Sequence, residues 1–220
     1  LSHRFSGAHG VWLSETEMSL LAQHNAGVSH NPMSNLRLGS GIAPLRSLAD
    51  AGVAMGVGTD ASNTSDGQNM FEAMRLAAML SRAQTVDNDH WVRTCEVFDM
   101  ATRGSARLMG FDRVGQIAEG WAADLVFLDR TYCHYTPQRA TLDQIVLAEN
   151  GAAVREVMID GRLVFAGDRI LTVDEADLRQ RALHAADRIT HANAEARTMN
   201  AAAAEVVKGF CHRHCTAHIH

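Results

Sequence analysis

The sequence predicts an α/β fold, in which short parallel strands alternate with helices. A run rich in Val, Met and Gly, Val53–Gly58, is typical of a strand buried on both faces, and the short segment Gly27–His30 is expected from its context to be the strand before it. A third strand is indicated by Phe5-Ser-Gly-Ala-His9. Asp60 follows the last strand directly, where a carboxylate cannot pack into a core. Because the carboxyl ends of parallel strands form the functional face of such folds, Asp60 is the first candidate for chemistry.

Helices are predicted between and after these strands. Ser14-Glu-Thr-Glu17 is a capping box that starts a helix. Pro44 suits the first turn of the next helix, and Gly52 suits its end. Two later segments carry apolar residues at helical spacing. The expected helices are Ser14 to about Asn25, Pro44 to Gly52, Gln68–Arg82, and Thr94–Met109 with Gly110 as its stop.

The pattern changes after Gly110. Gly120–Asp129 and Val154–Phe165 are strand-like, and Asp160-Gly161 inside the second run indicates a hairpin. An Ala-rich helix is expected from Asp174 to about Val207. The last residues form a polar tail rich in His. The predicted parts are therefore residues 1–112, 113–172, 173–210 and 211–220.

Composition excludes several classes of protein. The chain has 220 residues and a net charge of −5, with no basic stripe, which argues against a nucleic-acid partner. It has no run of 18 apolar residues, so no membrane span is expected. Four scattered cysteines without a disulfide framework, and no visible signal peptide, favour a reducing cytoplasm. Because the chain begins with Leu1, we expect its natural N-terminus to be missing.

Three motifs occur in a recognisable order: Ala8–Ser14, Ser29–Pro44 and Gly58-Thr-Asp60. This order resembles the C-terminal half of the amidohydrolase superfamily. The most similar branch holds adenosylhomocysteine/methylthioadenosine deaminases, guanine-type deaminases and triazine chlorohydrolases. The resemblance runs from about Ala8 to about Ile170. It implies that the three strands are strands six to eight of a (β/α)8 TIM barrel, followed by part of a small flanking β-sandwich.

The resemblance implies that Asp60 ligates a catalytic divalent metal, which is Zn, Fe or another ion, and shuttles a proton. A carboxylate beside Zn²⁺ stays ionised as an oxygen ligand. It can also accept the proton of metal-bound water, whose pKa falls to about 7. From the residues alone, an alternative is that Asp60 caps a following helix, because Ser62–Ser65 is a turn-like run.

His9 corresponds, by the same resemblance, to the histidine of the sixth strand. That residue polarises the attacking water or hydrogen-bonds the leaving group, and a neutral imidazole can do both. From the residues alone, an alternative is that His9 is a surface or core histidine hydrogen-bonded to the backbone. The polar loop His30–Asn35 borders the implied site, and Asn35 is a candidate substrate contact. Alternatively, Asn31-Pro32 only initiates a turn.

Two departures from the family pattern leave the substrate open. Trp12 stands where members often carry a second His. Thr64-Ser65-Asp66 replaces the usual Ser-Asn-Asn or Ser-Asn-Asp.

A second candidate metal site lies at the C-terminal end of the chain, where alternating His and Cys side chains could bind Zn²⁺ or Ni²⁺. The alternative is a disordered terminus. These tail residues are Cys211, His212, His214, Cys215, His218 and His220.

The expected function is that of a metal-dependent hydrolytic deaminase of a purine-, pterin- or triazine-like heterocycle, with triazine dechlorination as alternative chemistry. By the resemblance, two His of strand one, one His of strand five and an acid–base Glu lie outside these 220 residues. We therefore expect no activity from this chain alone, since a catalytic zinc needs three protein ligands. The competing hypothesis is a non-catalytic half-barrel that acts through assembly, because unpaired strand edges drive pairing. A homo-oligomer is expected.

Overall fold

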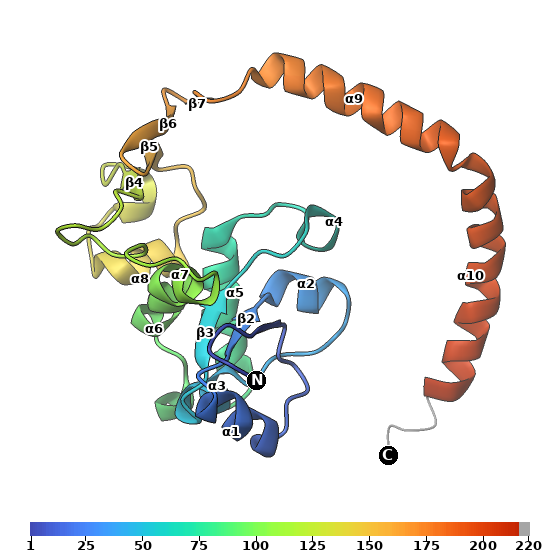
Figure 1. Ribbon diagram of the computed structural model, residues 1–220, viewed down its shortest axis with the longest axis horizontal. Helices are drawn as coiled ribbons and strands as arrows, with labels where there is room; N and C mark the ends of the chain where they lie inside the picture. The colour runs from blue at the N-terminus through green and yellow to red at the C-terminus, as the bar shows by residue number, and fades with distance from the viewer. Residues whose placement is uncertain (216–220) are drawn as a thin grey trace. The chain divides into compact units, whose positions relative to one another are not determined.

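The computed structural model describes residues 1–215 (Figure 1). The chain divides into two compact units, Leu1–Arg169 and the part from Ile170 onward. Both of its sheets begin in the first unit. A further division near residue 112 stays a prediction.

A three-stranded parallel sheet forms the first part of unit 1. It consists of β1 (Ser6–Ala8), β2 (Gly27–His30) and β3 (Ala54–Val57), in that order. Ala8 pairs with Ser29, and Ser29 pairs with Gly56. The three predicted strands and their parallel direction are confirmed. His9 and Asp60 lie just beyond the carboxyl ends of the two outer strands.

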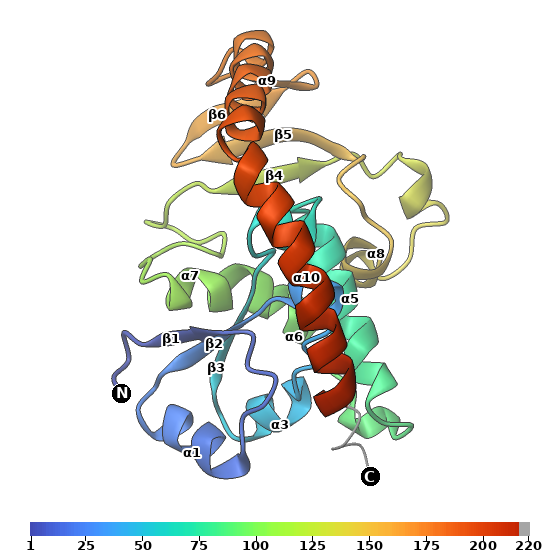
Figure 2. The same cartoon turned by 90° about the vertical axis from the view of Figure 1, so that its right-hand side faces the viewer.

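The two faces of this sheet are packed differently. Helices α1 (Glu15–Gln23) and α3 (Leu45–Asp50) cover the face that carries Val28. On this face Val57 packs against α5 (Met70–Ala83). The other face carries small residues. Leu108 of α7 (Ser105–Leu108) lies against Gly27 and Gly56 on this face, and Figure 2 shows α7 on the side of the strands opposite α1.

The helix predicted at Thr94–Met109 is present as one continuous helical stretch, with a π-helical turn that the sequence did not predict. It consists of α6 (Thr94–Asp99), the π-helical turn Met100–Gly104, and α7 (Ser105–Leu108). A Cβ atom on Gly104 would lie 2.1 Å from the carbonyl oxygen of Met55. The glycine therefore allows this stretch to lie directly against β3. Ser105 Oγ lies 2.9 Å from the Val57 oxygen and accepts a hydrogen bond from the Val57 amide at 3.1 Å.

Local signals for the other helices agree with the structure in part. The capping box at Ser14 is confirmed, with Ser14 N donating to a Glu17 carboxylate oxygen at 2.8 Å. The segment expected as a polar loop after β2 instead contains a short helix, α2 (Pro32–Arg37). Pro32 occupies its first turn, where its missing N–H costs nothing. A second short helix, α4 (Ser62–Ser65), follows β3.

The second part of unit 1 contains most of an antiparallel sheet. Its strands are β4 (Leu125–Leu128), β5 (Val154–Ile159), β6 (Arg162–Ala166) and β7 (Arg169–Ile170), in that order. The predicted hairpin is confirmed, because β5 and β6 pair across Asp160-Gly161 and both turn residues have positive φ. Three further elements were not predicted: the 3-10 turns η1 (Asn88–His90) and η3 (Cys133–Tyr135), and α8 (Thr141–Leu147).

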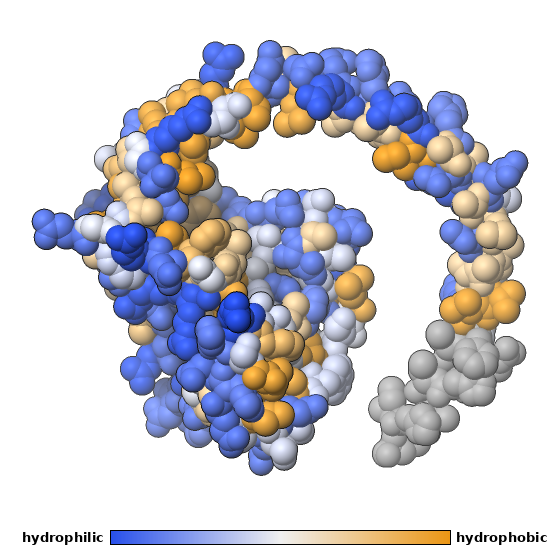
Figure 3. Space-filling view, in the orientation of Figure 1, coloured by the Kyte–Doolittle hydropathy of each residue, from blue (hydrophilic) through white to orange (hydrophobic). Residues whose placement is uncertain are grey.

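Two helices, rather than the single one expected, make up most of unit 2. They are α9 (Glu175–Ala192) and α10 (Ala194–Cys215). The break falls at Asn193, whose side chain donates to the Ile189 oxygen at 3.0 Å. Such a bond back to the preceding turn competes with helical continuation. No residue of α9 is buried, and its apolar side chains interrupt the polar surface in Figure 3.

Helix α10 extends into the segment expected as a tail. The backbone is described as far as Cys215, but the predicted tail metal site, from Cys211 onward, lies outside the described side chains. Within residues 1–215, no helix combines the length and the apolar character needed to cross a bilayer.

Candidate active site

Three predicted site residues meet beyond the carboxyl ends of the parallel strands. His9 Nε2 lies 3.7 Å from Asp60 Oδ2. His9 Nδ1 lies 2.8 Å from Asn35 Oδ1. Each residue follows a different strand of the sheet, so parallel pairing alone brings three distant segments to one edge. The structure thus joins His9, Asn35 and Asp60 in one continuous cluster.

Asp60 presents one free carboxylate oxygen to this cluster. Its Oδ1 accepts a hydrogen bond from the Ala61 amide at 2.7 Å, which leaves Oδ2 facing His9. The nearby Ser34 hydroxyl, and next the Ala61 amide, lower the pKa of Asp60 below its usual range. The N-cap of α4 is Ala61, so Asp60 is not the capping residue of that helix.

Both His9 and Asp60 have left-handed backbone conformations, with φ of 71° and 61°. This conformation costs an L-residue about 1–2 kcal/mol. A hydrogen bond holds the His9 backbone in place: its main-chain N–H donates to the Ser29 main-chain oxygen at 2.8 Å. This bond continues the pairing of β1 with β2. Strained residues of this kind cluster at functional sites, because the surrounding structure must hold them in place.

The segment from His30 to Asn35 supplies buried polar groups beneath the cluster. His30 and Asn35 are both 1% exposed. Burial, and next the neighbouring His9, lower the pKa of His30 to about 4, so its ring is neutral near pH 7. Among the described residues, neither ring nitrogen of His30 has a hydrogen-bond partner, and the same is true of Ser34 Oγ and Asn35 Nδ2.

Sequence reasoning included Ser34 in the polar loop but did not predict its effect on Asp60. A signal was available. Asn31, Ser34 and Asn35 have the i, i+3, i+4 spacing that places side chains on one face of a helix. With the helix starting at Pro32, that face is the buried one.

An apolar hollow of about 430 Å³ opens beside His9. Trp12 contributes to its wall and is 86% exposed. A Cβ atom on Gly41 would lie 3.4 Å from the Trp12 ring, so the ring rests against this glycine. The lining residues are Ala8, His9, Gly10, Val11, Trp12, Leu13, Leu38 and Ser40.

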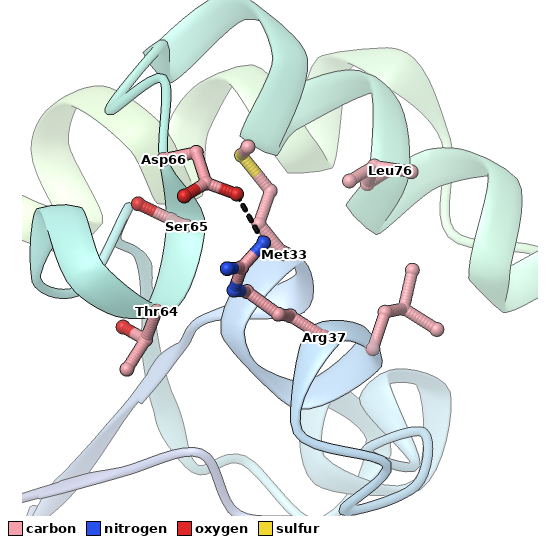
Figure 4. A pocket seen from close by; sticks show the side chains of 7 residues that line it. Met33, Arg37, Thr64, Ser65, Asp66 and Leu76 are labelled. Carbon is pink, nitrogen blue, oxygen red and sulfur yellow. Dashed lines mark hydrogen bonds and ion pairs between the residues drawn. The ribbon is translucent and has the colours of Figure 1, made fainter. Parts of the chain in front are cut away.

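A smaller hollow of about 190 Å³ lies where α2 approaches α4 and α5. Figure 4 shows Arg37 of α2 pointing toward Asp66, with which it forms an ion pair. Asp66 ends α4, so the pair links the segment that carries Asn35 to the segment that follows Asp60.

The described residues supply part of a metal site. Oδ2 of Asp60 is an available oxygen donor of the kind that binds zinc. Among the side chains that the structure describes, however, no group of three or more His, Cys, Asp or Glu could hold a metal ion. Asp60 therefore fits the role of one ligand, and a complete site needs others.

Comparison with known proteins decides the family. The model of the amidohydrolase family matches residues 2–164. The chain belongs to the amidohydrolase family. A 5-methylthioadenosine/S-adenosylhomocysteine deaminase of Haloarcula marismortui is 38% identical over 186 residues, which cover 84% of this chain and 43% of the relative. A 5'-deoxyadenosine deaminase of Methanosphaera stadtmanae is 36% identical over 170 residues, 77% of this chain and 40% of the relative.

Solved structures of family members agree with the fold. The chain superimposes with a TM-score of 0.82 on an adenosine deaminase from Xanthomonas campestris with bound zinc, at 33% identity, covering 86% of this chain and 43% of that one. An atrazine chlorohydrolase from Arthrobacter aurescens complexed with zinc gives a TM-score of 0.78 at 27% identity, covering 83% and 41%. The mixed α/β fold is thus confirmed. The chain spans less than half the length of these relatives.

Proposed function

We propose that this chain is the C-terminal part of a zinc-dependent hydrolytic deaminase that acts on an adenosine derivative. The observation that carries the proposal is the approach of His9 Nε2 to within 3.7 Å of Asp60 Oδ2, at the carboxyl ends of two parallel strands. The deaminase names of the sequence relatives support the choice of substrate class.

In this proposal β1, β2 and β3 are strands six to eight of a (β/α)8 barrel, and the antiparallel sheet is part of the flanking β-sandwich. The TM-score of 0.82 with a zinc-bound deaminase, over 43% of that chain, supports this assignment. Three parallel strands cannot close a barrel, which needs eight.

The roles of the two reactive residues follow from their free atoms. Bound zinc supplies an activated water molecule. Asp60 would hold the zinc with Oδ2, the oxygen that the Ala61 amide leaves free, and would accept a proton from the attacking water. His9 Nε2 faces the same space and hydrogen-bonds the reacting group as ammonia departs. The predicted contact of Asn35 with substrate stays a prediction.

The hollow beside His9 supports a substrate with an uncharged, apolar portion. Trp12, Val11 and Leu38 present apolar surface there, and Ser40 is the only hydroxyl residue among those lining the hollow. An alkylthio or deoxy substituent loses little on entering such a site, whereas an unpaired hydroxyl loses its hydrogen bonds to water. Guanine-, pterin- and triazine-like rings remain alternatives, as does dechlorination of a triazine.

A second candidate function is that of a non-catalytic half-barrel which acts through assembly. One observation favours it: the described residues hold no group of three metal-binding side chains. A cytoplasmic location and a homo-oligomeric state remain predictions under either function.

The test compares this chain with the longer protein that the proposal implies. Ammonia release from 5'-methylthioadenosine, 5'-deoxyadenosine and adenosine is measured with zinc present. We expect activity in the longer protein, a loss of at least about 100-fold for Asp60→Asn, and none in the 220-residue chain alone. Full activity of the Asp60→Asn variant contradicts the deaminase proposal. Ammonia release by the 220-residue chain alone contradicts the expectation that this chain is inactive by itself.

A further inference from the structure

The contact between His9 and Asn35 joins two segments that are 26 positions apart in the chain. The distance of 2.8 Å from His9 Nδ1 to Asn35 Oδ1 is that of a full hydrogen bond. Asn35 is a rigid partner. It is 1% exposed. Its main-chain N–H donates to the Asn31 main-chain oxygen at 3.0 Å, and its main-chain oxygen accepts from the Ser40 N–H at 2.9 Å.

The His9 ring is held from its own side as well. The amide of His9 donates to Ser29, and the Gly10 amide donates to the Ala8 oxygen at 2.9 Å, which closes a tight turn around the residue. Because φ of His9 is 71°, this turn directs the ring away from the path that an extended strand would take. The orientation of the ring is thus determined by backbone bonds and by Asn35 together.

This geometry has a consequence for the proton on the ring. A neutral imidazole carries one N–H, and an amide oxygen can only accept a hydrogen bond. With Oδ1 of Asn35 opposite Nδ1, the proton belongs on Nδ1. The Asp60 carboxylate favours the opposite tautomer, but its distance of 3.7 Å from Nε2 is too long for a hydrogen bond. The shorter, partly buried contact therefore determines the tautomer.

We propose that Asn35 is a positioning residue that holds His9 in its Nδ1–H tautomer, so that the lone pair of Nε2 faces Asp60 and the reacting group. The catalytic consequence rests on the proposed function. The tautomer itself is a property of this chain. In this role Asn35 acts through His9.

The direct test is imidazole ¹⁵N spectroscopy of the labelled chain, without metal or substrate. A long-range ¹H–¹⁵N correlation at pH 9, well above the ordinary His pKa of about 6.5, distinguishes the two tautomers. The His9 signals are assigned by their loss in His9→Gln. We expect Nδ1 to carry the proton and Nε2 to be unprotonated. The opposite pattern, or a ring protonated on both nitrogens, overturns the proposal.

Matched variants distinguish the effect of a hydrogen-bond acceptor at position 35 from the effect of side-chain packing. Asn35→Asp keeps an acceptor oxygen, and we expect it to keep the Nδ1–H tautomer. Asn35→Leu has a similar size without an acceptor, and we expect it to move the proton to Nε2. The exposed His24 is the internal control, whose signals stay unchanged. If the Leu variant does not fold, Asn35→Ala gives the same test. Retention of Nδ1–H without an acceptor overturns the proposal.

Failure of this inference is distinguishable from failure of the proposed function. An Nε2–H tautomer in the unmodified chain overturns the role of Asn35 and leaves the deaminase proposal intact. In the active longer protein, Asn35→Leu is expected to lower kcat by about 100-fold with little change in KM, because it places a proton where a lone pair is needed. Asn35→Asp is expected to recover most of that loss. Equal kcat losses in both variants contradict the positioning role.

Discussion

The two segments that meet at His9 differ in burial and in backbone strain. The segment after β2 is buried, with His30, Ser34 and Asn35 each exposed by 1% or less. The segment after β3 is more open, and Asp60, Asp66 and Gln68 all have positive φ. The difference in burial indicates different roles for the two segments. A buried segment can hold a neighbour in one orientation, whereas an open segment can reach a ligand.

The same contrast appears in two pKa values that shift in the same direction for opposite reasons. Burial lowers the pKa of His30 because it penalises the charged ring. The nearby Ser34 hydroxyl, and next the hydrogen bond from the Ala61 amide, lower the pKa of Asp60 because they stabilise the charged carboxylate. Acid therefore destabilises the fold at both places, but over different ranges of pH.

The largest expected effect concerns His30. Its pKa is about 4 in the folded chain and about 6.5 in the unfolded chain, so only the unfolded chain takes up this proton between these values. The stabilisation is complete above pH 6.5 and is lost as the pH falls to 4. It amounts to about 3 kcal/mol of the free energy of unfolding. Urea unfolding at pH 7, 5.5 and 4 measures the loss.

The matched variants are His30→Leu, which removes the titrating ring, and His24→Leu, which removes an exposed one. We expect a flatter pH dependence between 6.5 and 4 only in the first variant. An unchanged slope in His30→Leu contradicts the burial argument.

A smaller effect tests the strain at His9. His9→Gly and His9→Ala both remove the bond to Asn35, but only glycine adopts a φ of 71° without a steric cost. The cost of about 1–2 kcal/mol for Ala is partly offset by the greater freedom that Gly loses on folding, so we expect the Gly variant to be more stable by about 0.5–1 kcal/mol. Thermal or urea unfolding measures the difference. If Ala is the more stable of the two, the left-handed conformation is not maintained in solution.

Asp60 is expected to contribute at lower pH than His30. Because its pKa is lower in the folded chain than its ordinary value of 3.8, its stabilisation is present above that value. It is lost as the pH falls further, through the folded pKa. Acid unfolding of the wild type and of Asp60→Asn should therefore converge only below pH 3.8. Convergence already at pH 5 contradicts this interpretation.

The smallest expected effect concerns the ion pair of Arg37 with Asp66, which links the two segments (Figure 4). Its side chains are 51% and 65% exposed, so we expect Arg37→Ala to cost about 0.5 kcal/mol or less. Arg46→Ala is the contrast, because Arg46 is 22% exposed and donates to Glu96 at 2.8 Å. Denaturant midpoints compare the two variants. An equal loss in both indicates that the link between the segments is stronger than its exposure implies.

Several local features could be predicted because neighbouring residues determine them. The capping box at Ser14, the hairpin at Asp160-Gly161 and the end of a helix near Gly110 depend on residues within a few positions. The helix at Pro32 and the break at Asn193 were missed, since in each case a polar residue was compatible with more than one local structure. The π-helical turn before Ser105 has no sequence signal of its own and accompanies close packing on β3.

The sequence by itself determined the parallel strands, the acid that follows the last of them and the family to which the chain belongs. Only the tertiary structure decided which atoms meet: Asn35 Oδ1 with His9 Nδ1, and Asp60 Oδ2 opposite His9 Nε2. The reason is physical. Strand formation depends on residues close together in the chain, whereas these contacts depend on the register of three strands and on left-handed turns at two of their ends.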